Sequence, residues 1–588
     1  MFLTPWVLAT LAAAQIPLSL PVTHGDAEAR QAIQLKEELE FRKLASSKDP
    51  LDRLGTLPET IREYATYSAS KGGVAGYAAS FDAYIKGGHP DPKIFDLKLK
   101  AVQDTLRETV PTYYQTMFNV ALARTLLKRS WNTAEARSLA ESAVAVDDRH
   151  DCLEDDRFSA VAHAIYTEKK EKRPLPFSYH NEDGEAHCRQ ETASRYALLG
   201  KIQVDGGMTE AGGVSFRKSL QEHSNADAAL GLAAIDRAKG DRSAVLDLLI
   251  DAQLTGALPA GEIQKNKALY IELHPGNTAQ DYDTVLDQRY AKSYINPVKD
   301  RTPTPQTTRP EHVALEELFT GADCEPCIAP DLATDAVLNR YTRDQVVVAI
   351  YHDNAPGPDP LTTTTSEVRA EYYGTGRSTP HVFLDGKELT IEEGPRSHAQ
   401  DAFEMLNKSI DPLLADHAQA SLKIAVHPDA DLLQVKVTGQ IGDVPPGTHL
   451  QILLLEDPMS YSGRNTMRFH PMVVRARAGS GGNDTAIAVR AHAELSQTYV
   501  FDLKKVETEN LAYYGHFKEE IEKRMSSLIS SGNTSKANVD AMAEFREQKN
   551  SIHRDRLAVV AFLQADESKH ILQTSFASVE RSPESKGR

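Results

Sequence analysis

Cysteine is scarce in this chain, with four residues in 588. Two of them, Cys324 and Cys327, stand three positions apart, and the sequence contains no second pair with this spacing. It also contains no two histidines four positions apart. A zinc ribbon or zinc finger takes its ligands from two such pairs, so the sequence excludes these classes of metal site.

Basic residues and long apolar runs are also in short supply. The chain has 66 Lys and Arg against 83 Asp and Glu, a net charge of −17, and no basic cluster. This balance argues against binding to nucleic acid. Beyond the N-terminus, no segment approaches the roughly 18 apolar residues that a membrane helix needs. With 41% hydrophobic residues, the chain is expected to be globular and to have no membrane span.

The N-terminus carries the one apolar stretch that indicates where in or outside the cell the protein is located. Residues 2–14 (FLTPWVLATLAAA) end in an Ala-x-Ala pattern and are too short to cross a bilayer. They predict a signal peptide over residues 1–14 and a periplasmic or extracellular protein. The stretch lacks the usual Lys or Arg before its apolar part, so an ordinary hydrophobic N-terminal helix is the alternative.

The segment Cys324-Glu325-Pro326-Cys327 has a context that favours redox chemistry. Residues 315–319 read as a strand, 331–340 as a helix and 345–351 as a buried strand of β-branched residues. The two cysteines therefore fall between a strand and a helix N-terminus, as they do in redox-active CxxC motifs.

A helix N-terminus changes the reactivity of a thiol. A free thiol has a pKa of roughly 8.5, and the dipole and free amides of a helix start favour its thiolate. We expect Cys324 to be the exposed nucleophile. Cys327, one turn into the helix, would be the resolving thiol. Pro326 suits a helix start because it has no amide proton to lose.

A second motif, Thr379-Pro380, follows further along the chain, with the strand and turn residues 381–386 behind it. Together with the CxxC context, it makes residues 311–412 resemble the thioredoxin-like family. Residues 315–327 and 351–360 are similar to a secreted bacterial subgroup of that family. The resemblance implies a thiol–disulfide oxidoreductase with no cofactor that acts on protein thiols or disulfides. It also implies a cis-proline loop facing a redox-active disulfide; the implied site residues are Cys324, Cys327, Thr379 and Pro380.

The chain departs from the family pattern at three points. Leu318 stands where thioredoxin has its buried acid, Asp323 stands where it has a tryptophan, and residues 354–360 form a proline-rich insertion. Glu316 or Glu317 is a candidate replacement for the acid, although an exposed glutamate at a strand end is the simpler interpretation.

These departures leave two other functions open. In the first, the thioredoxin-like fold is a catalytically idle scaffold in a non-enzymatic interaction protein. In the second, the thiols deliver copper, with His352 or His381 as the added ligand. A fold alone cannot decide between them, because function resides in sites.

Residues 25–295 read as a helical region that resembles tetratricopeptide repeats. Residues 196–200 are echoed at 227–231, and each segment precedes a glycine-containing turn and a second apolar helix. A solenoid of helix pairs offers a concave surface to a protein partner. The alternative is a solenoid that packs only against the rest of the chain.

The other two cysteines, Cys152 and Cys188, lie in this helical region. They occupy polar segments, 147–156 and 180–189, that we expect to be poor in helix. In an oxidising compartment they predict a structural disulfide. A metal site with the adjacent His150 and His187 is the alternative, but its spacing fits no known module.

Alternating threonine and proline mark residues 296–310 as a linker. Beyond the thioredoxin-like part, residues 415–580 predict a β-sandwich-like domain with a helical insertion at about 507–551. Residues 455–470 resemble a β-domain appended to secreted bacterial thioredoxin-like units. Within it, Glu456, Asp457 and His470 are candidates for a metal or acid–base site, or else solvated loop residues. The expected fold class is multidomain α+β.

Overall fold

The computed structural model describes residues 67–87, 90–171, 179–299, 310–376, 378–479, 487–530 and 536–579. The predicted signal peptide, 1–14, and most of the predicted linker lie outside these residues. The chain divides into two compact units, Met1–Ala252 and Gln253–Arg588. Within the described residues, no helix is both long enough and apolar enough to cross a membrane.

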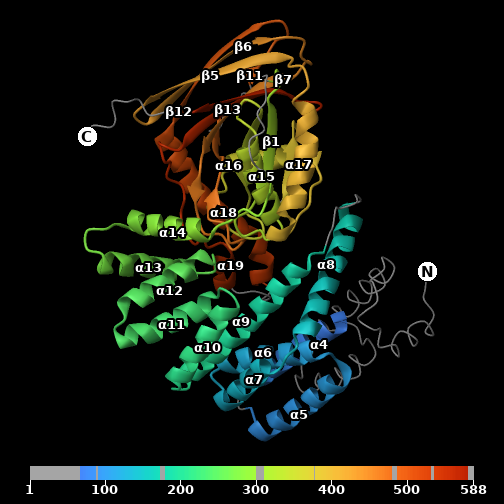
Figure 1. Cartoon of the computed structure of the whole chain (residues 1–588), viewed down its shortest axis with the longest axis vertical. Coiled ribbons are helices and arrows are strands. Elements are labelled where there is room, and N and C mark those ends of the chain that lie inside the picture. The colour runs from blue at the N-terminus through green and yellow to red at the C-terminus, as the bar shows by residue number, and fades with distance from the viewer. Residues whose placement is uncertain are drawn as a thin grey trace, which may run out of the picture. The chain divides into compact units, whose positions relative to one another are not determined.

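The described part of the first unit is helical, coloured from blue to green in Figure 1. Several consecutive helices contact each other, as α6 contacts α7 and α10 contacts both α9 and α11. The helices are α4 (Tyr67–Lys86), α5 (Pro92–Thr109), α6 (Thr112–Lys128), α7 (Thr133–Ala145), α8 (Arg149–Glu171), α9 (Asn181–Asp205), α10 (Thr209–Glu222), α11 (Ala226–Lys239) and α12 (Arg242–Leu254).

One phenylalanine accounts for the sequence echo. Phe216 of α10 lies against Gly200 of α9 and Gly231 of α11. A Cβ added at Gly200 would lie 2.6 Å from Phe216 Cδ1, and one added at Gly231 would lie 2.3 Å from Phe216 Cζ. Real Cβ atoms do not approach so closely, so both helices need glycine where they meet this ring. The echo thus marks two helices that make room for the same side chain.

Cys152 and Cys188 form a disulfide, with their Cα atoms 6.0 Å apart. The expectation of a helix-poor environment is wrong, because Cys152 lies in α8 and Cys188 in α9. Both are buried among the apolar side chains of the first unit. Most of the charged residues around them are at least partly exposed, but Asp148 and Asp155 are buried, where Asp148 pairs with Arg195 and Asp155 accepts a hydrogen bond from Tyr114. The density of charge is why these segments read as polar loops.

The second unit is built around a nine-stranded sheet with the order β14-β13-β7-β10-β2-β1-β3-β4, in which β11 also pairs with β7. β1 runs parallel to β2 and antiparallel to β3. The strands are β1 (Ala314–Thr320), β2 (Val346–His352), β3 (His381–Leu384), β4 (Lys387–Leu389), β7 (Thr448–Glu456), β10 (Val473–Arg477), β11 (Ile487–Ala488), β13 (Leu557–Ala565) and β14 (Ile571–Ser578).

The predicted strands around the CxxC motif are confirmed as β1 and β2. Both are buried along their whole length, as expected of parallel strands with both faces covered. The helix that follows Cys327 is α15 (Ile328–Arg340), and it packs against α17 (Ala399–Leu413) and the two strands. A third helix, α16 (Thr364–Tyr373), precedes β3.

The sheet runs across the boundary between the two predicted C-terminal domains. β10 pairs in parallel with β2 at Val473 and Ile350, and the amide of Ile350 donates to Met472 O at 3.0 Å. The strands of residues 311–412 therefore share one hydrogen-bonded sheet with five strands of residues 415–580, namely β7, β10, β11, β13 and β14. Sequence patterns show where strands lie but not which strands pair, so this continuity had no signal in the sequence.

A second sheet, in the order β12-β6-β5, gives the C-terminal region its two-layer packing. Successive residues of β7 alternate between two cores. Leu450, Ile452 and Leu454 pack with this sheet, whereas Leu453 and Leu455 pack with the core around β1 and β2. β7 is therefore buried on both faces. The strands of the second sheet are β5 (Ala420–Asp429), β6 (Leu432–Ile441) and β12 (Glu494–Asp502).

Helices complete the second unit. The predicted insertion is helical and consists of α18 (Leu503–Ser530) and α19 (Lys536–Met542). Two helices of the predicted helical region, α13 (Ala260–Leu273) and α14 (Ala279–Ser293), also belong to this unit. A short pair, β8 (Met459–Ser460) and β9 (Phe469–His470), precedes β10.

Two adjacent glycines of α10 provide a test of the helix contacts in the first unit. A Cβ at Gly212 would meet Val204 Cγ2 at 2.5 Å and the backbone oxygen of Gly200 at 2.9 Å, whereas one at Gly213 would meet nothing closer than 3.6 Å. We expect Gly212→Ala to destabilise the unit by about 1–3 kcal/mol through overpacking. Gly213→Ala should instead stabilise it by about 0.5–1 kcal/mol. Urea unfolding followed by circular dichroism measures both, and equal effects would contradict the packing described.

The disulfide between Cys152 and Cys188 closes a 36-residue interval. Replacing both cysteines with serine should lower the free energy of unfolding of the first unit by about 3–4 kcal/mol, because the unfolded chain regains the entropy of an open loop. Replacing Cys324 and Cys327, which are three positions apart, is the control and should cost less. An unchanged unfolding midpoint in the Cys152/Cys188 variant would contradict a structural role for this bridge.

Candidate functional site

The CxxC motif forms a turn between β1 and α15. Cys324 and Cys327 are joined by a disulfide, with their Cα atoms 5.3 Å apart. α15 begins at Ile328, so Cys327 is its N-cap residue and not one turn inside the helix as predicted. Two backbone hydrogen bonds join the turn and the start of α15 to Gly394. The amide of Gly394 donates to Pro326 O at 2.8 Å, and the amide of Ala329 donates to Gly394 O at 3.0 Å.

The structure brings the second motif to the disulfide. Cys324 Sγ lies 3.8 Å from the carbonyl oxygen of Thr379, and the Thr379–Pro380 peptide bond is cis. Pro380 is buried and leads directly into β3. Because β3 pairs with β1, which carries the CxxC turn at its end, the sheet register places these two distant segments side by side.

The disulfide is less accessible than the sequence indicated. Cys324 is 3% exposed and Cys327 is 0% exposed, while Glu325 and Pro326 between them are exposed. The prediction of an exposed Cys324 is therefore wrong for this oxidised form. The side chain of Cys324 faces Thr379 instead of solvent.

Residues 463–465 and Arg546, from the C-terminal region, contact the loop before Cys324. The amide of Asn465 donates to Ala322 O at 3.1 Å, and a Cβ at Gly463 would lie 2.0 Å from that same oxygen. Asp323 accepts a hydrogen bond from the Arg464 amide at 3.0 Å and forms an ion pair with Arg546. The sequence does not predict this role of Arg546, because Arg546 lies 223 positions from Asp323 and no local pattern links the two residues.

Both candidate replacement acids have structural partners. Glu316 and Glu317 are fully buried, so the interpretation as exposed strand-end residues is wrong. Glu316 accepts a hydrogen bond from Thr334 at 2.5 Å, and burial raises its pKa to about 7. Glu317 accepts two hydrogen bonds from Arg369, at 2.8 and 2.7 Å. An ion pair of this kind ties Glu317 to α16 and leaves it unsuited to exchange protons with a thiol.

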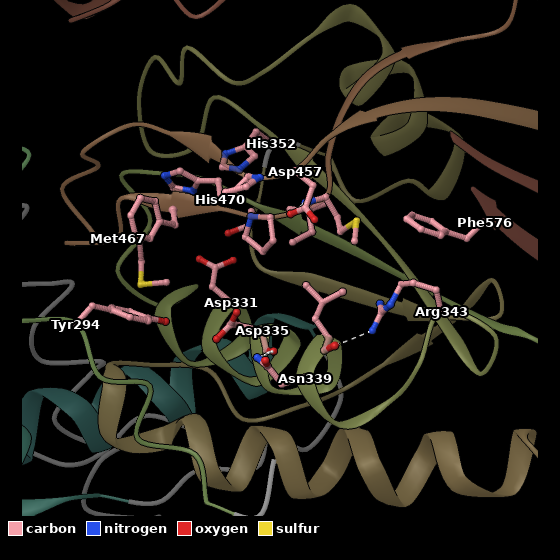
Figure 2. Close-up of a pocket in the computed structure, with 17 residues that line it drawn as sticks. Tyr294, Asp331, Asp335, Asn339, Arg343, His352, Asp457, Met467, His470 and Phe576 are labelled. Carbon is pink, nitrogen blue, oxygen red and sulfur yellow. Dashed lines mark hydrogen bonds between the residues drawn. The ribbon is translucent and has the colours of Figure 1, made fainter. Parts of the chain in front are cut away.

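A different carboxyl group lies closer along the chain to Cys327. Asp331 is one helical turn after Cys327, and its backbone amide donates to Cys327 O at 2.9 Å. Burial raises the pKa of Asp331 to about 7, against the opposing influence of Thr320 and His352. Its side chain lines a cavity of about 520 Å³ (Figure 2). No sequence pattern singles out this residue, because an acid in the first turn of a helix is commonplace.

Two buried histidines lie on the other side of this cavity. His352 Nδ1 is 2.7 Å from Asp359 Oδ2. Burial acts to raise the pKa of Asp359, but His352 and the backbone amides of Ala322 and Leu361 together lower it below the usual value. Burial lowers the pKa of His470 to about 3, helped by His352, so His470 is neutral. Its Nε2 lies 3.0 Å from Tyr461 O.

The remaining candidates do not form a metal site. His352 is paired with Asp359, and His381 lies between Ser378 and Glu388, at 2.9 and 2.8 Å. Among the described residues, no three His, Cys, Asp or Glu side chains are grouped so that they could hold a metal ion. The described residues therefore give no support to copper delivery through His352 or His381, or to a metal site at His150 and His187.

The predicted grouping in residues 455–470 separates in the structure. Asp457 and His470 both line the cavity. Glu456 instead forms ion pairs with Arg475, at 3.5 Å, and with His553. Glu456, Asp457 and His470 therefore do not form one site.

Comparison with models of known protein families gives no match, and comparison with curated proteins gives none. Among solved structures, the chain is similar to HBP35 of Porphyromonas gingivalis, with a TM-score of 0.32 and 12% identity. The match covers 46% of this chain and 76% of that one. Any functional assignment therefore rests on the residues around Cys324.

Asp331 makes stability depend on pH. Its pKa in the folded protein, about 7, is above the 3.8 of an unperturbed aspartate. The unfolded chain therefore releases this proton first, and stability is lost as pH rises from about 4 to about 7. We expect Asp331→Asn to be more stable than the wild type at about pH 8 and equal to it near pH 4, as measured by thermal unfolding. Asp331→Glu, which still titrates, is the control, and a difference that does not vary with pH would contradict the assignment.

Proposed function

We propose that this protein is an exported thiol–disulfide oxidoreductase of thioredoxin-like type that works through Cys324 and Cys327. The observation that carries the proposal is the 3.8 Å separation between Cys324 Sγ and the carbonyl oxygen of Thr379. It places a CxxC disulfide at a helix start beside an extended segment that precedes a strand. The elements β1, α15, β2, β3, β4 and α17, with the strand order β4-β3-β1-β2, follow the order expected of a thioredoxin-like domain, and this supports the proposal.

The reaction is a two-electron exchange between sulfur atoms. In the reduced protein, the thiolate of Cys324 attacks one sulfur of a substrate disulfide, forming a mixed disulfide and releasing one substrate thiolate, which takes up a proton. Cys327 then loses its proton and attacks Cys324 Sγ, so that the second substrate thiolate leaves and the Cys324–Cys327 disulfide forms. The substrate is reduced and the protein is oxidised. The reverse sequence oxidises a substrate dithiol.

The site offers a place for a substrate peptide. Thr379, whose carbonyl oxygen lies 3.8 Å from Cys324 Sγ, is preceded by the exposed Ser378. An extended peptide can pair with backbone groups of such a segment, which would align its disulfide with Cys324. No cofactor is required by this chemistry. The helical first unit is a second candidate surface for a protein partner.

One observation favours a non-enzymatic function instead. Cys324 is 3% exposed, and the loop before it is held by Asn465 and Arg546. A disulfide enclosed in this way can serve as a structural bridge in an interaction protein. The two functions differ in a measurable property, since only the first requires Cys324 to react with a disulfide in another molecule.

The proposal predicts catalysis of insulin reduction by dithiothreitol. The full chain should accelerate the precipitation of reduced insulin, and Cys324→Ser should return the rate to that of dithiothreitol alone, because no other residue supplies the attacking thiolate. Cys327→Ser should retain a single mixed-disulfide step and lose turnover.

The variant with serine at both Cys152 and Cys188 is the matched control and should keep the wild-type rate. A folded wild-type protein that does not exceed the rate of dithiothreitol alone would favour the non-enzymatic function. Export is tested separately, by the mass of the mature protein, which should lack residues 1–14.

A further inference from the structure

A serine, a histidine and a glutamate form a hydrogen-bonded row at the segment that leads into β3. His381 Nε2 lies 2.9 Å from Ser378 Oγ, and His381 Nδ1 lies 2.8 Å from Glu388 Oε1. A nucleophile within hydrogen-bond reach of a base, with a third group that orients the base, is the geometry of a serine hydrolase triad, which recurs on unrelated folds. The proposed thiol exchange uses none of these three side chains.

The register of the β3–β4 hairpin brings the histidine and the glutamate together. Phe383 of β3 lies opposite Glu388 of β4. His381 stands two residues before Phe383 and shares its face of the sheet, which makes His381 and Glu388 diagonal neighbours across the two strands. Ser378 precedes His381 by three residues. The pairing of two adjacent strands therefore sets the spacing between His381 and Glu388.

The serine is accessible to solvent, whereas the histidine is largely enclosed. Ser378 is exposed, while the side chain of His381 is 14% exposed. An ionised carboxylate only accepts hydrogen bonds, so in the neutral form of His381 the facing Glu388 places the proton on Nδ1. Nε2 then offers its lone pair to the Ser378 hydroxyl, as a general base must. The carbonyl oxygen of Thr375, 2.9 Å from Ser378 Oγ, is a second acceptor for the same hydroxyl, so this oxygen is held between two groups.

Two backbone amides at the site are available to stabilise an oxyanion. Among the described residues, the amides of Ser378 and Thr379 have no hydrogen-bond partner. The amide of the nucleophile itself is one of the donors that serine hydrolases direct at the carbonyl oxygen on which negative charge develops. One short segment thus supplies the nucleophile and candidate donors for the oxyanion.

We propose that Ser378, His381 and Glu388 form a second active site, which hydrolyses small carboxylic esters. Ser378 Oγ attacks the carbonyl carbon of the ester while its proton passes to His381 Nε2. The C–O bond to the alcohol breaks, the alcohol leaves with that proton, and the acyl group stays on Ser378. Water then attacks the acyl group and gives a proton to His381. The carboxylic acid leaves as this proton returns to Ser378 Oγ, and no atom is oxidised or reduced. Glu388 touches no reacting atom and positions His381.

An ester fits this site better than an amide. Because Ser378 is exposed, the site encloses little of a substrate, and little binding energy is available to lower the barrier. An ester needs less assistance, since an alcohol leaves more readily than an amine. The inference does not depend on the redox chemistry, because the Cys324–Cys327 disulfide does not enter the reaction.

The test uses p-nitrophenyl acetate and diisopropyl fluorophosphate as probes, with the full chain at about pH 8 in its oxidised form, so that no thiolate competes. The ester should be hydrolysed with saturation, and peptide mass spectrometry should locate a phosphoryl adduct on Ser378. Ser378→Ala should lose the adduct, and both Ser378→Ala and His381→Gln should lower kcat by at least about ten-fold. Ser526→Ala, which removes an exposed serine on α18, is the control and should leave hydrolysis and labelling unchanged.

Glu388→Gln separates a positioning role from a structural one. It should lower kcat by at least about ten-fold while KM and the thermal unfolding midpoint stay unchanged, because it disturbs the orientation of His381 and not the binding of the ester. Absence of an adduct on Ser378 in the wild type would overturn the proposal, as would ester hydrolysis that Ser378→Ala leaves unchanged. The variant with serine at both Cys324 and Cys327 should hydrolyse the ester like the wild type, so the outcome is separate from that of the insulin assay.

Discussion

The second unit depends on one buried ion pair, between Glu317 of β1 and Arg369 of α16. Glu317 is 0% exposed and also accepts a hydrogen bond from Tyr351 of β2 at 2.9 Å. Arg369 donates to Gln564 of β13 at 2.8 Å, so the pair links the strands beside the CxxC turn to the C-terminal strands. Removing either partner would leave an uncompensated buried charge, which typically costs about 3–5 kcal/mol. The interaction therefore specifies one arrangement of strands and helix.

This constraint shapes the candidate site. Because β1 is paired on both sides, by β2 and by β3, the turn at its end lies in a defined position against Thr379. The C-terminal region takes part in the same arrangement, through the continuous sheet and through the ion pair between Asp323 and Arg546. Residues that the sequence assigns to a separate domain thus hold the loop that directly precedes Cys324.

Local features of the site could be predicted from the sequence, whereas its long-range contacts could not. The β-branched residues of β2 and the apolar alternation of β6 identify strands because they report burial within one element. The segments around Cys152 and Cys188 were expected to be poor in helix because their charged residues resemble those of a loop, but they belong to α8 and α9. Arg546, Gln564 and the cavity groups around Asp331 gain their roles from contacts with residues far along the chain, and no local pattern encodes such contacts.

The central claim is that Cys324 and Cys327 form an exchangeable pair, unlike Cys152 and Cys188. Equilibrating the full chain in redox buffers of known potential and counting alkylated cysteines by mass spectrometry tests this directly. Exchangeable pairs titrate between about −270 and −120 mV, whereas structural disulfides resist reduction to below about −300 mV. The account predicts that Cys324 and Cys327 become alkylated together within the first range while Cys152 and Cys188 stay bonded. Reduction of both pairs only below about −300 mV would contradict it.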